Sequence, residues 1–91
     1  MPMPRKLPNR MLMRRACSLT LKTLRQKIGI TQERLALESN IDRGYMGGLE
    51  RGLHSPSIET IYKLLPIFRI TFVQFAEQYE KSMRRLRRES E

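Results

Sequence analysis

The 91-residue chain contains one cysteine and one histidine, Cys17 and His54, which fall on different predicted elements. A single cysteine excludes an internal disulfide bond, as is typical of proteins of the reducing cytosol. One cysteine and one histidine cannot complete a zinc site without additional Asp or Glu ligands. No apolar run is long enough to span a membrane. Residues 11–13 are too short for the core of a signal peptide, so we expect a cytoplasmic protein.

The sequence also lacks the patterns that carry catalysis. No strand is evident, and no glycine-rich phosphate-binding loop follows one. Gly47 and Gly48 fall inside a predicted helix and lack the lysine that a phosphate-binding loop needs. No nucleophile has an obvious base beside it. We therefore expect no enzymatic activity, no metal and no cofactor.

Acidic residues are absent from the first 27 positions, which hold eight Lys and Arg. Residues 28–80 carry five basic and seven acidic side chains, and residues 81–91 carry five basic and two acidic ones. The formal net charge of +9 therefore comes from the two flanks. Basic charge clustered in this way is the electrostatic footprint of a nucleic-acid-binding protein.

Residues 31–52 predict two short helices joined by a tight turn, the pattern of a helix-turn-helix. Residues that favour helix caps or left-handed turns mark its boundaries: Thr31, Asn40, Asp42 and Gly52. Apolar residues at helical spacing predict its buried face: Leu35, Ala36, Ile41, Met46 and Leu49.

Two further helices flank this pair. Spacings of three and four between Leu21, Leu24 and Ile28 predict a helix over residues 18–28 that Gly29 ends, and Cys17 extends its buried stripe. Residues 9–15 could add a short helix capped by Asn9. Another helix opens at Pro56 and Ser57 and carries the apolar residues Ile58, Ile61, Leu64, Leu65 and Phe68. Pro66 predicts that this helix has a kink or ends early. Arg69 stands where a glycine would more comfortably end the helix, so we expect strain at this corner.

A last helix begins at a capping box of Thr71 and Gln74. Its apolar residues recur in steps of four and three, the period of a helix that packs along another helix: Phe72, Phe75, Ala76, Tyr79, Met83 and Leu86. A second copy of the chain could cover Met83 and Leu86, which predicts a homodimer. The alternative is a helix that frays after Tyr79 and leaves its arginines solvated. Its small apolar face disfavours a membrane-surface anchor.

Four stretches of residues 18–76 together resemble the phage-repressor (Cro-like, or XRE) helix-turn-helix family, and most of all the small controller proteins of restriction–modification systems and mobile-element repressors. They are Leu24-Arg25, Gly29-Ile30-Thr31-Gln32-Glu33-x-Leu35-Ala36, Asp42-Arg43-x-Tyr45-Met46-x-Gly48-Leu49-Glu50-Arg51-Gly52 and Pro56-Ser57-Ile58-Glu59-Thr60-Ile61. The resemblance implies an all-α, five-helix, lambda-repressor-like domain that dimerises on a palindromic operator, with residues 42–51 in the major groove.

The resemblance also implies roles for single residues. Gln32 would bond a phosphate, and Arg43 and Tyr45 would face base edges or the backbone. Arg51, His54 and Ser55 would touch phosphates, and an ion pair between Arg25 and Glu50 would tie the recognition helix to the domain. The DNA-binding residues expected are Thr31, Gln32, Arg43, Gly44, Tyr45, Gly47, Gly48, Arg51, His54 and Ser55, and the dimer contacts expected are Phe72, Phe75, Tyr79, Met83 and Leu86.

Gly44, Gly47 and Gly48 depart from the family pattern, because relatives usually carry side chains at several of these positions. Each interior glycine costs a helix about 1 kcal/mol relative to alanine. The helix backbone could approach DNA very closely, or base readout could be sparse and rest on Arg43, Tyr45 and DNA shape. Alternatively, Gly47 or Gly48 could pack against another element of the protein.

The leading hypothesis is a dimeric, sequence-specific transcriptional regulator, acting as a repressor or autoregulator or through contact with RNA polymerase. The alternative is an antitoxin or adaptor whose main role is to bind another protein. The chain divides into a basic N-terminal arm (residues 1–16), a helix-turn-helix domain (residues 17–76) and a basic C-terminal helix extension (residues 77–91).

Overall fold

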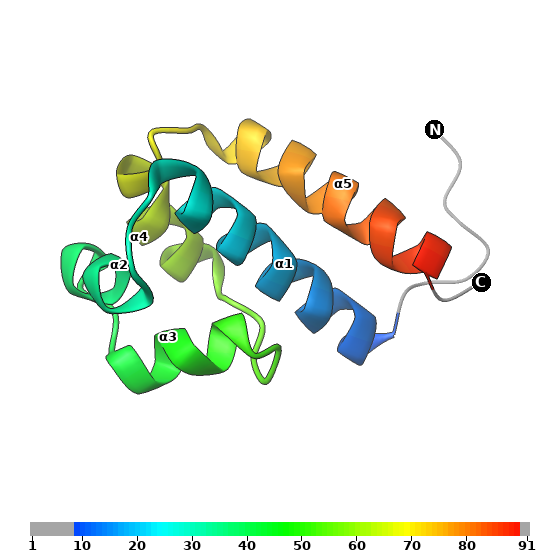
Figure 1. Cartoon of the computed structure of the whole chain (residues 1–91), viewed down its shortest axis with the longest axis horizontal. Helices are drawn as coiled ribbons and strands as arrows, with labels where there is room; N and C mark the ends of the chain where they lie inside the picture. Colours follow the sequence, from blue (N-terminus) through cyan, green and yellow to red (C-terminus); the bar gives the residue numbers. More distant parts are fainter. Residues whose placement is uncertain (1–8, 90–91) are drawn as a thin grey trace.

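The computed structural model describes residues 9–89, which form five α-helices and thus the predicted all-α fold (Figure 1). The helices are α1 (Arg10–Ile28), α2 (Gln32–Ser39), α3 (Arg43–Glu50), α4 (Ile58–Phe68) and α5 (Phe72–Glu89). The two long helices α1 and α5 lie side by side (Figure 1). Helices α3 and α4 pack against α1, and α2 packs against α3 and α4. Within residues 9–89, no helix combines the length and the apolar character needed to cross a membrane.

The helix boundaries follow from the predicted caps. Thr31 and Asp42 each accept a hydrogen bond from the backbone N–H three residues on, at 3.1 and 3.0 Å. Asn40 and Gly52 adopt left-handed conformations, with φ of 56° and 75°. The capping box that opens α5 also forms, through reciprocal bonds of 2.8 and 3.1 Å. These local signals place α2 and α3 in the sequence without any help from tertiary contacts.

The N-terminal boundary of the domain differs from the prediction. Residues 10–16, expected to belong to the arm, form the first turns of α1, which is continuous to Ile28. Asn9 caps it by accepting the N–H of Leu12 at 2.7 Å. Ile28 was expected in the core but is 37% exposed, because the core side of α1 ends at Leu24. Residues 1–8 of the predicted arm lie outside the described residues.

The extra turns of α1 overturn the prediction that α5 uses its apolar stripe to contact a second copy. Met83 and Leu86 are 4% and 6% exposed, because they pack on Ala16 in a second small core. Phe75 is buried in the main core, and Phe72 and Tyr79 pack, partly buried, against the main core and the small core respectively. A hydrogen bond of 2.9 Å between the hydroxyls of Thr20 and Ser82 also joins α1 to α5. The heptad-like spacing therefore reports a partner helix within the same chain.

Helix α4 shows a second difference. It continues past Pro66 to Phe68 and ends where Arg69 adopts a left-handed φ of 58°. The expected strain at this corner is confirmed, since a non-glycine residue pays a steric penalty in that region. Among the apolar residues expected on this helix, Ile58 is exposed because it lies in the first turn of α4, outside the buried stripe that starts at Ile61.

Candidate nucleic-acid interface

Helix α3 is held against the domain by the inner side of its eight residues. Met46 and Leu49 are fully buried in the main core, and Ile41 fills the turn that leads into the helix. Burying such a side chain contributes about 1.5–3 kcal/mol. The inner face therefore fixes the position of α3, and the first three residues of the helix stay open to a partner.

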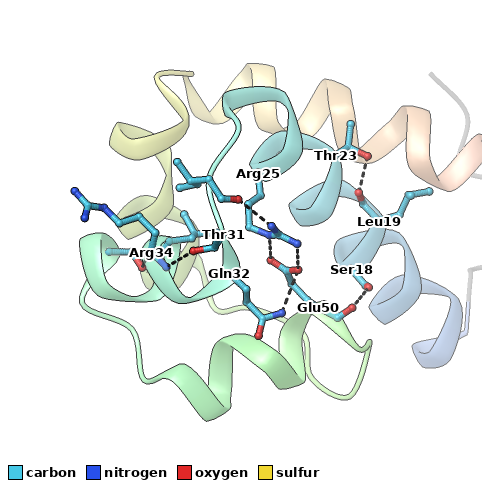
Figure 2. Close-up of polar contacts among 11 residues, drawn as sticks. Ser18, Leu19, Thr23, Arg25, Thr31, Gln32, Arg34 and Glu50 are labelled. Carbon is cyan, nitrogen blue, oxygen red and sulfur yellow. Dashed lines mark hydrogen bonds and ion pairs between the residues drawn. The ribbon is translucent and has the colours of Figure 1, made fainter.

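The C-terminal end of α3 is fixed by a buried ionic network (Figure 2). The Glu50 carboxylate accepts hydrogen bonds from Nε and Nη2 of Arg25, at 2.8 and 3.0 Å, and from Nε2 of Gln32 at 3.3 Å. Arg25 also donates to the carbonyl of Ile30 at 2.9 Å. The predicted ion pair is thus present, in the two-pronged geometry that suits arginine and carboxylate.

Ser18 was not predicted as part of this network. Its hydroxyl donates to the backbone carbonyl of Glu50 at 2.6 Å and so fastens the last residue of α3 to α1. A serine in a helix gives no sequence signal for such a role, because hydroxyls of this kind usually bond within their own helix.

At the N-terminal end of α3, the structure leaves three residues in reach of a ligand. Arg43 and Gly44 are exposed and Tyr45 is partly exposed. Arg43 pairs with Glu33 of α2 at 2.6 Å, but both side chains are largely in solvent, so exchanging this partner costs little. The ideal Cβ position at Gly44 meets only the Asp42 carboxylate, at 3.1 Å. This end of α3 therefore offers an arginine, an aromatic ring and bare backbone.

The other two glycines of α3 are buried, which corrects the expectation that they face DNA. A Cβ at Gly48 would lie 2.6 Å from the His54 ring, and one at Gly47 would lie 3.0 Å from the Arg51 guanidinium. The His54 ring also stacks on Tyr45, with centroids 5.5 Å apart. Packing against another element, one of three explanations open from the sequence, is therefore confirmed for Gly48.

The remaining predicted contacts divide between two places. Thr31 and Gln32 lie at the start of α2, next to α3, and Arg51 is exposed at the end of α3. The Gln32 amide has a second N–H beyond the one given to Glu50, so it keeps a donor for an anion. Ser55 instead lines an apolar groove of about 300 Å³ beside α1 and α5, which Thr31, Gln32 and Arg51 do not line.

These features define a helix-turn-helix DNA-binding domain: a short helix anchored at one face and one end, with polar groups exposed at its start. The chain belongs to this family, in its XRE type. A sequence profile described as Helix-turn-helix matches residues 21–75.

Among curated proteins, an uncharacterized HTH-type transcriptional regulator, y4dJ, of Sinorhizobium fredii is 31% identical over 62 residues, 68% of this chain and 80% of that protein. The HTH-type transcriptional regulator SutR of Escherichia coli K12 is 34% identical over 61 residues, 67% of this chain and 34% of that longer protein.

Among solved structures, the restriction–modification controller protein C.Esp1396I, as a tetramer in complex with its natural 35 base-pair operator, is 31% identical with a TM-score of 0.71. The match covers 78% of this chain and 93% of that one. The clp gene regulator ClgR of Corynebacterium glutamicum shares the fold, with a TM-score of 0.78 at 24% identity over 96% of this chain and 87% of that one.

Proposed function

We propose that the chain is a dimeric transcriptional repressor or autoregulator that binds a palindromic operator through α3. The observation that carries this proposal is the contrast within α3, where a buried face and a buried ionic anchor support an exposed start. Rigid support of this kind is what groove readout requires. We also infer that the protein acts in the cytoplasm by binding and not by catalysis.

In this proposal α3 lies in the major groove with its first residues against the base edges. Arg43 exchanges Glu33 for guanine, a contact worth about 1–3 kcal/mol of discrimination. Gln32 donates its free N–H to a phosphate at the start of α2, where unpaired backbone N–H groups favour an anion. The His54 ring keeps Tyr45 in place by stacking on it, and Arg51 faces the backbone.

We propose that the dimer uses an exposed apolar surface on α4 and α5, in place of the buried stripe. Ile58, Tyr62 and Val73 are all more than half exposed, at 59%, 57% and 67%. Tyr62 stacks on Phe72 with centroids 5.5 Å apart, which connects the two helices across this surface. Exposed aromatic and aliphatic residues grouped in this way are typical of a contact between subunits.

Selection of bound DNA from a random pool, followed by mobility-shift titration, tests the function. We expect a palindrome whose half-sites lie about one helical turn apart. Arg43→Ala should lower the preference for the selected site over other sequences. Gln32→Ala should weaken binding to all sequences by the same factor. Lys63→Gln on α4 is the control for loss of one charge. Absence of any enriched site would refute the proposal and favour an adaptor.

The dimer surface has its own test in sedimentation equilibrium. Replacing Tyr62 and Val73 with serine should shift the protein towards monomer and leave its helical content unchanged. Leu37→Ser, at a residue that is 74% exposed on α2, is the matched control. A dimer that survives the double replacement would place the contact elsewhere.

A further inference from the structure

We propose that a basic surface on α1 and α5 binds the phosphate backbone of the duplex beyond the half-site contacted by α3. This surface, the basic flank, consists of Arg15, Lys22, Lys81, Arg84, Arg85 and Arg88, all exposed. The inference rests on the proposed function, because it takes α3 to lie in the major groove. It adds a second contact region that the helix-turn-helix itself does not contain.

The basic flank is continuous with the end of α3. The ideal Cβ position at Gly52 lies 3.8 Å from the Arg14 carbonyl oxygen, so α1 touches the residues that follow α3. An open groove of about 350 Å³ joins Arg51 to Arg15 and Lys22 of α1 and to Arg85 of α5. In Figure 1 the N-terminal end of α1 and the C-terminal end of α5 lie close together, beyond the end of α3. Charge therefore continues from the recognition helix along one side of the molecule.

The charge of this region is almost entirely positive. Residues 10–22 of α1 hold four basic side chains and no acid, and residues 81–89 of α5 hold five basic side chains and one acid, Glu89. Glu89 pairs with Arg85 at 3.2 Å, but both side chains are more than half exposed, so a phosphate can replace it at little cost. Glu50 also lines the groove, yet its carboxylate already serves Arg25. Within residues 9–89, the basic flank thus holds more cations than acids.

The duplex is the partner that fits both the charge and the position. A recognition helix enters the major groove by its first residues, so its last residue lies towards the phosphate backbone that bounds the groove. DNA is stiff over this length, and it carries one negative charge for about every 1.7 Å of its axis. On α1 the basic flank runs from Arg15 to Lys22, about 10 Å along the helix, a length over which the duplex carries several phosphates. Duplex that continues past α3 therefore runs along the basic flank.

Salt dependence of binding on duplexes of two lengths tests this inference. The probes are the selected site cut at its edges and the same site extended by about one helical turn on each side. The test variant is Arg15→Gln with Arg85→Gln. The control variant is Lys63→Gln with Arg69→Asn, which removes the same charge elsewhere, and asparagine tolerates the left-handed φ of Arg69.

For the unmodified protein, extension should steepen the dependence of log affinity on log salt concentration by about 0.9 for each phosphate contacted. The test variant should lose about two such contacts per subunit on the long duplex and none on the short one. The control variant should keep the difference between the two lengths. No effect of extension, or equal losses for both variants, would overturn the inference.

The two proposals fail in distinguishable ways. If the unmodified protein shows no length effect but keeps its site preference, the basic flank is rejected and the reader function still stands. If selection returns no site, the same measurement on mixed-sequence duplexes of the two lengths still reports whether residues 15 and 85 contact phosphate. In that case a length effect lost in the test variant would support the basic flank without the proposed operator.

Discussion

For two ion pairs of this domain, distance and burial predict opposite orders of contribution to stability. The variant Arg25→Ala, compared with Arg43→Ala, decides between the two criteria. The Arg43–Glu33 pair is the shorter, at 2.6 Å against 2.8 Å for Arg25–Glu50. Its side chains are 71% and 65% exposed, however, whereas those of Arg25 and Glu50 are 18% and 2% exposed. We expect burial to decide the outcome, since water screens the exposed pair.

Arg25→Ala leaves the Glu50 carboxylate buried with a single long hydrogen bond from Gln32. Breaking a buried pair from one side costs about 3–5 kcal/mol. The guanidinium retains some contact with solvent, so we take the lower end, about 3 kcal/mol of unfolding free energy. For a domain of this size, that lowers Tm by about 12–24 °C. Arg43→Ala should cost at most about 0.5 kcal/mol.

Urea unfolding followed by circular dichroism measures both variants. A third variant, Arg25→Met with Glu50→Leu, should recover most of the loss, because no buried carboxylate is left unpaired. The remaining loss comes from the Ile30 carbonyl and the Gln32 amide, each of which gives up one hydrogen bond. Equal losses for Arg25→Ala and Arg43→Ala would refute the reasoning from burial. If the double variant is as unstable as Arg25→Ala, the loss of unfolding free energy comes from packing and not from the unpaired carboxylate.

Three further predictions concern residues that the fold has already placed. Gly48→Ala should displace the His54 ring and weaken DNA binding, whereas in a His54→Ala background the same change should stabilise the domain by about 1 kcal/mol in urea unfolding. Burial raises the pKa of the Cys17 thiol to about 11; alkylation at pH 8 should therefore be about 100-fold slower than in the unfolded chain and should accelerate as pH rises towards that value. Met83→Ala should cost about 2–5 kcal/mol of unfolding free energy without changing the oligomeric state seen by sedimentation; a monomer would restore the dimer role of the stripe.

The helix boundaries were predictable because their signals are local. Thr31, Asp42 and Thr71 each bond to a backbone N–H three residues away, so the information lies within one turn of the chain. The left-handed residues Asn40 and Gly52 carry the turn on either side of α3 in the same way. The residues that enclose the core followed from periodicity, as Leu35 and Met46 show by being fully buried.

The pairing of α1 with α5 was missed because it joins residues far apart in the chain. The spacing on α5 predicts an apolar stripe but does not identify the helix that covers it. The complementary stripe is present in the sequence, since Leu12, Ala16 and Leu19 follow one another in steps of four and three. This stripe lies among arginines directly after a proline-rich segment, a composition that favours an arm over a helix.

The structural role of the glycines in α3 could not be predicted from the sequence, because the side chain that covers Gly48, the His54 ring, comes from the loop after the helix. Gly52 turns the chain back, and the N–H of Leu53 bonds to the Gly48 carbonyl at 2.9 Å. This turn brings the His54 ring over the helix, at a place where any Cβ would collide with it. The geometry of the loop, and not the composition of the helix, therefore explains the second glycine of the pair.

The same arrangement limits how much sequence the proposed reader can discriminate. Gly44 alone of the three glycines faces outward, and Arg43 and Tyr45 are the side chains beside it. Few base contacts give a modest preference for the right site, at about 1–3 kcal/mol each. The basic side chains along α1 and α5 would meanwhile strengthen binding to every sequence alike. We therefore expect tight, strongly salt-dependent binding with a small ratio between specific and non-specific affinity, so that cooperation between the two half-sites supplies most of the selectivity.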